Sequence, residues 1–145
     1  MAERRGGCLC GGVRYRVTAP LDHMDACHCG MCRKVSGGIV LGLNVPVDGI
    51  VWERDATLRT YASSDWAERG FCSACGSSLF WRIATPGAGW LSLMAGTLDD
   101  LSGLTLKTEI YIDHKPDGYA FAGGTKKMTE AEVVAAFAQM DGDGA

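Results

Sequence analysis

The seven cysteines of this 145-residue chain fall into three close groups. The groups are Cys8 with Cys10, then Cys27, Cys29 and Cys32, and finally Cys72 with Cys75. Thiolates at such spacings are common ligands of zinc, whereas structural disulfides are rare in a reducing compartment. The cysteines therefore predict metal or redox chemistry.

The first and last pairs can supply four ligands to one ion. Cys72-Ser-Ala-Cys75 is a Cys-x-x-Cys turn that offers two thiolates, and Cys8 and Cys10 share a face if the chain there is extended. Two pairs predict a closed, structural zinc site that joins the start of the chain to its middle. The alternative is a redox Cys-x-x-Cys motif, which is less favoured because no βαβ pattern surrounds Cys72.

The other three cysteines lie in DACHCGMCRKVSG, residues 25–37, and predict a zinc site with an open position. Cys27 and Cys29 would share a strand face and Cys32 would return on the following turn, leaving a fourth position open, as in catalytic zinc sites. The alternative is a closed site completed by His28. Because a residue between two such ligands points to the opposite face, we expect His28 to be a surface residue, a nearby hydrogen-bond donor or a proton carrier.

The number of thiolates indicates the chemistry of this open site. Three thiolates around zinc leave a net negative site, which is a poorer Lewis acid toward water than a three-histidine site. A sulfur-rich zinc suits a thiol as fourth ligand, bound as the thiolate that attacks electrophiles. We therefore expect carbon–sulfur bond making or breaking, with Cys27, Cys29 and Cys32 at the catalytic site. Arg33 would offset negative charge or bind a substrate carboxylate, unless it is only an exposed arginine.

The elements that must position these residues are mainly strands. Short runs rich in β-branched or aromatic residues, separated by Gly, Pro and Asp, predict strands. They cover Val13–Ala19, Ile39–Val45, Leu58–Ser63, Leu79–Ile83, Trp90–Met94 and Leu104–Ile112. One C-terminal helix is predicted, opened by a capping box from Thr129 to Glu132 and followed by apolar Val133, Val134, Phe137 and Met140. The pattern predicts one all-β domain of antiparallel sheets over residues 1–145, with a short C-terminal helix.

Composition narrows the possible partners and the compartment. The chain is 47% hydrophobic and 21% charged with a net charge of -3, which is typical of a soluble globular protein and argues against a nucleic-acid binder. The N-terminus has no apolar signal segment, and the longest apolar run, residues 39–47, is too short to cross a bilayer. We therefore expect a cytoplasmic protein without a membrane partner. The sequence indicates no oligomeric state.

Three motifs together resemble the glutathione-dependent formaldehyde-activating enzyme family, which also includes centromere protein V-like domains. They are Gly7-Cys8-x-Cys10-Gly11, Cys27-His-Cys-x-x-Cys-Arg33 followed by Ser36-Gly37, and Phe71-Cys72-x-x-Cys75-Gly76, with Ala95-Gly-Thr-Leu-Asp99 as a further match. The resemblance spans roughly residues 4 to 115. It implies a zinc-containing β-tent fold of folded antiparallel sheets.

The resemblance also implies two zinc ions per chain and a reaction. The structural zinc would be bound by Cys8, Cys10, Cys72 and Cys75, and the catalytic zinc by Cys27, Cys29 and Cys32. A zinc-dependent carbon–sulfur lyase of this family would act on glutathione or another small thiol and an aldehyde such as formaldehyde, forming S-hydroxymethylglutathione. The alternative is a non-catalytic zinc β domain that binds glutathione or a protein partner.

The chain departs from the family near its last predicted strand. Many members carry a histidine where this chain has Glu109, and a Pro-Trp pair where it has Pro116-Asp117. The predicted zinc ligands are unaffected, whereas the identity of the substrate is not fixed by the motifs.

Overall fold

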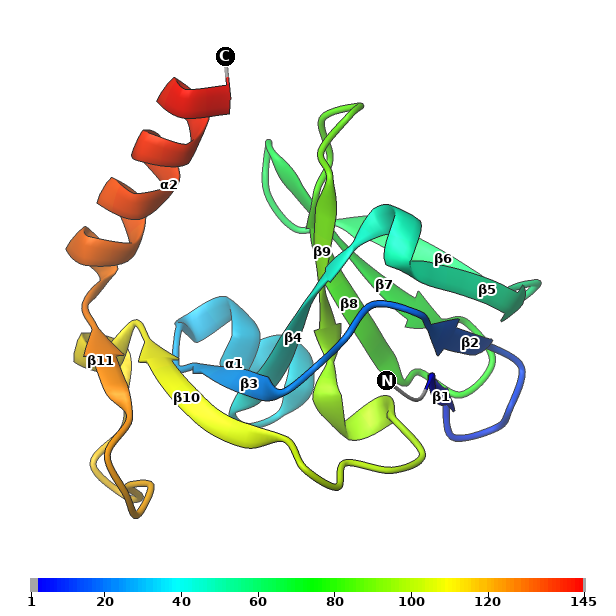
Figure 1. Ribbon diagram of the computed structural model, residues 1–145, viewed down its shortest axis with the longest axis horizontal. Helices are drawn as coiled ribbons and strands as arrows, with labels where there is room; N and C mark the ends of the chain where they lie inside the picture. Colours follow the sequence, from blue (N-terminus) through cyan, green and yellow to red (C-terminus); the bar gives the residue numbers. More distant parts are fainter. Residues whose placement is uncertain (1–2, 145) are drawn as a thin grey trace. The chain divides into compact units, whose positions relative to one another are not determined.

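The computed structural model describes the backbone of residues 3–144 and the side chains of residues 3–139 (Figure 1). The chain divides into two compact units, each formed from two segments of sequence. The first unit comprises Met1–Met24 and Leu41–Thr105, and the second comprises Asp25–Val40 and Leu106–Ala145. A single domain over residues 1–145 stays a prediction.

The first unit contains two antiparallel groups of strands. Three strands pair in the order β1-β2-β5, and five pair in the order β4-β9-β8-β7-β6 (Figure 1). The first group is β1 (Arg4–Gly7), β2 (Arg14–Val17) and β5 (Ile50–Arg54). The second is β4 (Val40–Pro46), β6 (Leu58–Ala62), β7 (Ala67–Cys72), β8 (Ser78–Ile83) and β9 (Trp90–Met94). Two 3₁₀ turns, η1 (Val47–Gly49) and η2 (Ala95–Thr97), complete the unit.

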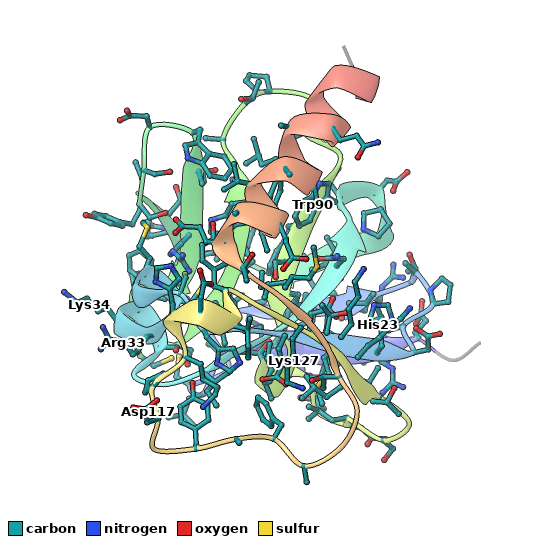
Figure 2. All side chains as sticks on the ribbon, turned by 90° about the vertical axis from the view of Figure 1, so that its left-hand side faces the viewer. His23, Arg33, Lys34, Trp90, Asp117 and Lys127 are labelled. Atoms are coloured by element: carbon teal, nitrogen blue, oxygen red, sulfur yellow. The ribbon has the colours of Figure 1, made fainter. Side chains whose placement is uncertain are left out.

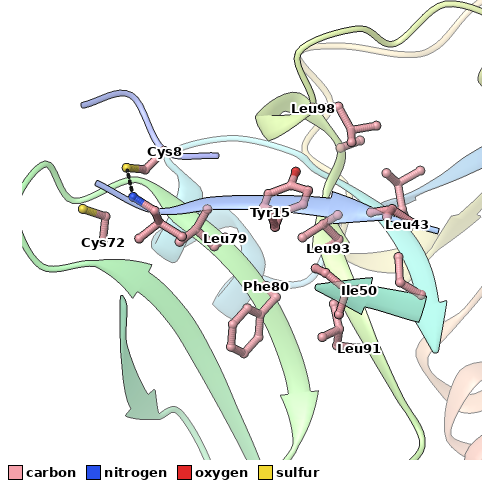
Figure 3. Close-up of a cluster of buried hydrophobic side chains, with 14 residues drawn as sticks. Cys8, Tyr15, Leu43, Ile50, Cys72, Leu79, Phe80, Leu91, Leu93 and Leu98 are labelled. Carbon is pink, nitrogen blue, oxygen red and sulfur yellow. Dashed lines mark hydrogen bonds between the residues drawn. The ribbon is translucent and has the colours of Figure 1, made fainter. Parts of the chain in front are cut away.

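Apolar side chains from both groups of strands form the core of this unit. Tyr15 on β2, Leu43 on β4 and Phe80 on β8 are almost completely buried (Figure 3). The hydroxyl of Tyr15 lies 2.7 Å from the Thr97 hydroxyl, so its polar end is also satisfied. Arg14 lies on the other face of β2 and pairs with a carboxylate on the protein surface. Buried and partly exposed residues therefore alternate along this strand.

The second unit contains the remaining short elements. These are the carboxyl end of β3 (His23–Cys27), α1 (Gly30–Ser36), β10 (Thr105–Ile110), η3 (Ile112–His114), β11 (Lys126–Met128) and α2 (Glu130–Gly144). Strands β10 and β11 pair in parallel, an exception to the predicted antiparallel arrangement.

The predicted capping box opens α2. Thr129 N donates to Glu132 Oε1 at 3.0 Å, and Glu132 N donates to Thr129 Oγ1 at 3.3 Å. Val133 is buried in the following turn, whereas Val134 is exposed, so the buried face is narrower than the apolar pattern predicts. The side chain of Met140, also predicted for this face, lies outside the described residues.

The prediction of a mainly β protein with a C-terminal helix is confirmed, and all six predicted strands form. Sequence reasoning missed the strands β1, β3, β5, β7 and β11 and the helix α1. Within residues 3–144, no helix is long and apolar enough to span a membrane.

One close approach inside the sheet yields a prediction about stability. Gly70 on β7 pairs with Phe80 on β8, and a Cβ atom at Gly70 would overlap the buried Phe80 ring. We expect Gly70→Ala to lower the free energy of unfolding by about 1–3 kcal/mol, because this ring cannot move aside in a close-packed core. Urea denaturation in zinc-containing buffer measures the effect.

The matched control is Gly89→Ala in the same unit, where an added Cβ would meet no atom within 4 Å. That variant should stay within about 0.5 kcal/mol of the wild type. Equal unfolding midpoints for both variants would contradict the close packing of Phe80 on Gly70.

Candidate metal centres

The four cysteines of the first unit meet at one point. The sulfur atoms of Cys8, Cys10, Cys72 and Cys75 all lie within 4.8 Å of one another. Cys10 Sγ is 3.6 Å from Cys8 Sγ and 3.8 Å from Cys72 Sγ. Four sulfurs at 2.3 Å from a tetrahedral zinc ion would be about 3.8 Å apart, so the cluster has the spacing of a zinc site. Figure 3 shows Cys8 and Cys72 side by side at the edge of the core.

Two turns bring these sulfurs together. Cys8 follows β1, and Gly11 N donates to Cys8 O across the turn that contains Cys10. The prediction that Cys8 and Cys10 share a face of an extended strand is therefore wrong, because a turn and not a strand joins them. On the other side, Cys72 ends β7, and Gly76 closes the Cys-x-x-Cys turn with a φ of 80°, which favours glycine.

Hydrogen bonds shift the pKa values of the thiols in this cluster in opposite directions. The Ser77 hydroxyl lies 3.2 Å from Cys75 Sγ and lowers the pKa of Cys75 to about 5. The Gly12 amide acts to lower the pKa of Cys10, but hydrogen bonds shared with the other thiols, Cys8 first, outweigh it and raise that pKa to about 11. Metal binding to all four sulfurs would thus displace protons.

The three cysteines of the second unit converge where β3 meets α1. The sulfur atoms of Cys27, Cys29 and Cys32 all lie within 4.8 Å of one another. Cys27 is the last residue of β3, Cys29 is the N-cap of α1, and Cys32 lies in the first turn of this helix. Sequence reasoning expected a turn here and missed the helix, although it predicted the convergence.

The helix start supplies a donor to one of these thiols. Cys32 N donates to Cys29 Sγ at 3.3 Å, as a side-chain cap does at a helix N-terminus. Hydrogen bonds with Cys27 and then Cys32 strongly lower the pKa of Cys29, whereas the bond with Cys29 raises the pKa of Cys27. Within the cluster, these contacts favour the thiolate form at Cys29 over that at Cys27.

His28, between two of these cysteines, is not part of the cluster. Its side chain is completely buried, with Nε2 2.8 Å from Glu109 Oε1 and Nδ1 2.8 Å from the Tyr119 hydroxyl. Both ring nitrogens are thus engaged away from the thiols, which counts against a closed site of three cysteines and one histidine. The expectation that His28 is a surface residue is wrong; a hydrogen-bonding role near the site agrees with the structure.

Glu109, the partner of His28, is itself buried at 2% exposure. Its Oε2 accepts a hydrogen bond from the Thr125 hydroxyl and lies 3.7 Å from Lys127 Nζ. Burial acts to raise the pKa of Glu109, but the bonds from Thr125 and His28 and the nearby lysine outweigh it and lower this pKa. An ionised carboxylate can only accept, so Nε2 of His28 carries a proton and donates a hydrogen bond to Glu109.

Tyr111 is a residue near the cluster that sequence reasoning missed. Among described residues it is the single non-glycine with positive φ, at 54°, a sparsely populated conformation found at functional sites. Burial and then the charge of Cys29 raise the pKa of its phenol. No sequence signal marks it, because it follows an ordinary strand.

Arg33 and Lys34, in the last turn of α1, are exposed and project away from the helix (Figure 2). Arg33 also acts electrostatically on the phenol of Tyr119, opposing the effect of burial on its pKa. A cationic side chain therefore stands one residue beyond Cys32, close to the hydrogen-bond network of His28.

A third group of possible ligands, Asp113, His114 and Glu130, is exposed. His114 Nε2 lies 3.0 Å from Glu130 Oε2, and Asp113 Oδ1 accepts from Glu130 N at 2.9 Å. These contacts cap α2 and form a surface ion pair, so the group has a structural explanation without metal.

Comparison with curated proteins finds relatives that align with most of this chain. An "Uncharacterized lyase" of Schizosaccharomyces pombe is 31% identical over 134 residues, covering 92% of this chain and 96% of the relative. A Halomonas elongata protein named "Putative glutathione-dependent formaldehyde-activating enzyme" is 31% identical over 121 residues, covering 77% of this chain and 76% of the relative.

A solved structure shares the fold. The crystal structure of a Rhodobacter sphaeroides protein matches with a TM-score of 0.55 at 19% identity, covering 71% of this chain and 99% of that protein. The sequence pattern of the glutathione-dependent formaldehyde-activating enzymes matches residues 3–114. With three converging thiols, four more in a second cluster and this match over most of its length, the chain belongs to the glutathione-dependent formaldehyde-activating enzyme family.

Proposed function

We propose that this protein is a zinc-dependent carbon–sulfur lyase that forms and cleaves the adduct of glutathione and formaldehyde, S-hydroxymethylglutathione. The observation that carries the proposal is the convergence of Cys27, Cys29 and Cys32 without a fourth metal-binding side chain among the described residues. Family membership and the names of the two relatives support the choice of thiol and aldehyde. Because the reaction requires reduced thiols, we place the protein in the cytoplasm.

Each cluster has a different role in this proposal. Cys8, Cys10, Cys72 and Cys75 would bind a structural zinc ion with four ligands, and the three thiols of the second unit would bind a catalytic one. A zinc ion with three thiolate ligands would offer its open position to the glutathione thiol and favour the thiolate form. The sulfur spacing and the donor set of both clusters fit this metal.

The reaction itself is a simple addition. The glutathione sulfur donates an electron pair to the carbonyl carbon of formaldehyde, a carbon–sulfur bond forms, and the carbon–oxygen π electrons move to oxygen. That oxygen takes up the proton lost by the thiol, so the step is balanced without oxidant or reductant. In reverse, the hydroxyl loses its proton and the carbon–sulfur bond breaks. Arg33 would bind a carboxylate of glutathione or offset the negative charge near the thiolates.

Metal analysis tests the assignment of the two clusters. Purified protein should contain two zinc ions per chain by elemental analysis. Cys29→Ser should lose one of them and stay folded by circular dichroism. Cys75→Ser should unfold, because structural zinc contributes about 10–16 kcal/mol of apparent binding free energy, comparable with the whole stability of a domain. If Cys29→Ser also unfolds the chain, its cluster is structural and the proposal fails.

Exchange spectroscopy tests the reaction. In a mixture of glutathione and formaldehyde, the protein should speed exchange between free glutathione and S-hydroxymethylglutathione at least about tenfold over the uncatalysed rate, equivalent to about 1.4 kcal/mol of barrier. Cys29→Ser should return the rate to the uncatalysed value. If glutathione binds by titration calorimetry while exchange is not accelerated, the protein is a carrier or binding domain instead.

The role of Arg33 is tested by comparison with its neighbour. Arg33→Ala should raise KM for glutathione about two- to fivefold with little change in kcat, which is the effect of one exposed ionic contact. Lys34→Ala is the matched control, since Lys34 is equally exposed in the same helical turn. Equal KM values for the two variants would show that Arg33 does not recognise the substrate.

A further inference from the structure

A buried polar network lies directly behind the three-cysteine cluster, and the proposed reaction does not use it. The side chain of His28 has no exposed surface and that of Glu109 has 2%. Burying an imidazole and a carboxylate is costly unless every polar atom is satisfied, and a half-satisfied network is worse than apolar packing. In this chain, every polar side-chain atom of His28 and Glu109 has a hydrogen-bond partner.

The network satisfies both ring nitrogens of His28 and both oxygens of Glu109. Nδ1 lies 2.8 Å from the Tyr119 hydroxyl, and Nε2 lies 2.8 Å from Glu109 Oε1. The second carboxylate oxygen accepts from Thr125, with Lys127 at 3.7 Å balancing its charge. Figure 2 shows Lys127 on β11. The imidazole is therefore held from both sides by β10 and the segment that leads into β11.

The backbone of His28 is fixed as well. Its N–H donates to Ile110 O at 3.1 Å, next to Glu109 on β10. Ring and backbone are thus attached to the same strand, and the residue so held separates two thiols of the cluster. If the ring lost a partner, the Cys27–Cys29 segment could rotate and the sulfurs would no longer converge.

We propose that Glu109 and Tyr119 are positioning residues, which act through His28 to hold Cys27 and Cys29 in the geometry that retains the metal ion of the open site. The inference rests on the proposed function, because it assumes that this cluster binds zinc. In other metal sites a carboxylate orients a histidine that is itself a ligand. Here the oriented histidine lies between two ligands and points away from them.

This role differs from ordinary packing in one respect. A network that only stabilises the fold would affect both metal clusters through unfolding. A positioning network affects the three-cysteine cluster and leaves the four-cysteine cluster, in the other unit, unchanged. The four-cysteine cluster is therefore an internal reference in every variant.

The test follows zinc release to a chromogenic chelator from the folded, zinc-loaded protein. The wild type should release zinc in two phases, and the fast phase should be absent from Cys29→Ser, which assigns it to the open site. Glu109→Leu and Tyr119→Phe should accelerate the fast phase about 10- to 100-fold, by analogy with the loss of metal affinity when the outer hydrogen-bond partners of a metal site are removed. The slow phase should not change.

Two further variants separate positioning from stability. Glu109→Gln keeps an acceptor for His28 Nε2 and should stay within about threefold of the wild type. Tyr15→Phe removes a tyrosine hydroxyl that is also bonded within the fold, but in the first unit and not in the unit that contains the three-cysteine cluster. Tyr15→Phe should leave the rates of both release phases unchanged, even if the variant unfolds at a lower denaturant concentration than the wild type.

The outcomes distinguish the two proposals. Unchanged fast release from Glu109→Leu and Tyr119→Phe, or parallel acceleration of both phases, would overturn the positioning role while leaving the proposed function intact. A wild-type protein that binds one zinc ion and releases it in a single phase, unaltered by Cys29→Ser, would overturn both.

Discussion

Seven thiols, in one cluster of four and one of three, are held at metal-binding distance within each cluster without forming disulfide bonds. The rest of the structure depends on the backbone turns and hydrogen bonds that hold them there. In the part of the chain that is described, no cysteine forms a disulfide bond. Cys8 Sγ and Cys10 Sγ are 3.6 Å apart, far beyond the roughly 2.05 Å of a disulfide bond. At this spacing, neighbouring sulfur atoms can share a proton through S–H···S hydrogen bonds when no metal is bound. The hydroxyls of Thr57 and Ser77 donate hydrogen bonds to Cys72 and Cys75 and thereby act to lower the pKa of these two thiols.

The two clusters solve this problem with different backbone structures. In the first unit, two tight turns present their sulfurs at the edge of a β core, and Gly76 is needed where the chain reverses. In the second, a strand end and a helix start present three sulfurs, with Cys29 as the N-cap. A cluster of four thiols can complete the tetrahedral coordination of a zinc ion without further side chains. The three-cysteine cluster has the buried imidazole of His28 behind it, which agrees with the proposal that this cluster keeps its shape around an open position.

The two cysteine clusters and the most regular strands could be predicted from the sequence, because their signals lie in residues that are close together in the chain. The β-branched and aromatic residues of Val13–Ala19 predicted β2, and a capping box at Thr129 predicted α2. Strands such as β1 and β7 were missed since glycines and charges break their pattern, and only pairing partners make them strands. The Glu109–His28 pair spans 81 residues, and the positive φ of Tyr111 is a tertiary result, so neither has a local signal.

Charge balance connects the buried network with the proposed recognition of substrate. Lys127 stands beside Glu109, and Thr125 and His28 donate to its carboxylate, so this negative charge is compensated inside the second unit. Arg33 is therefore not needed to neutralise the Glu109 carboxylate. It lies exposed in the last turn of α1, one residue after Cys32. Thiolates repel an anionic substrate, and glutathione carries carboxylates. A cation placed there opposes that repulsion, so a site of three thiolates can accept an anionic thiol.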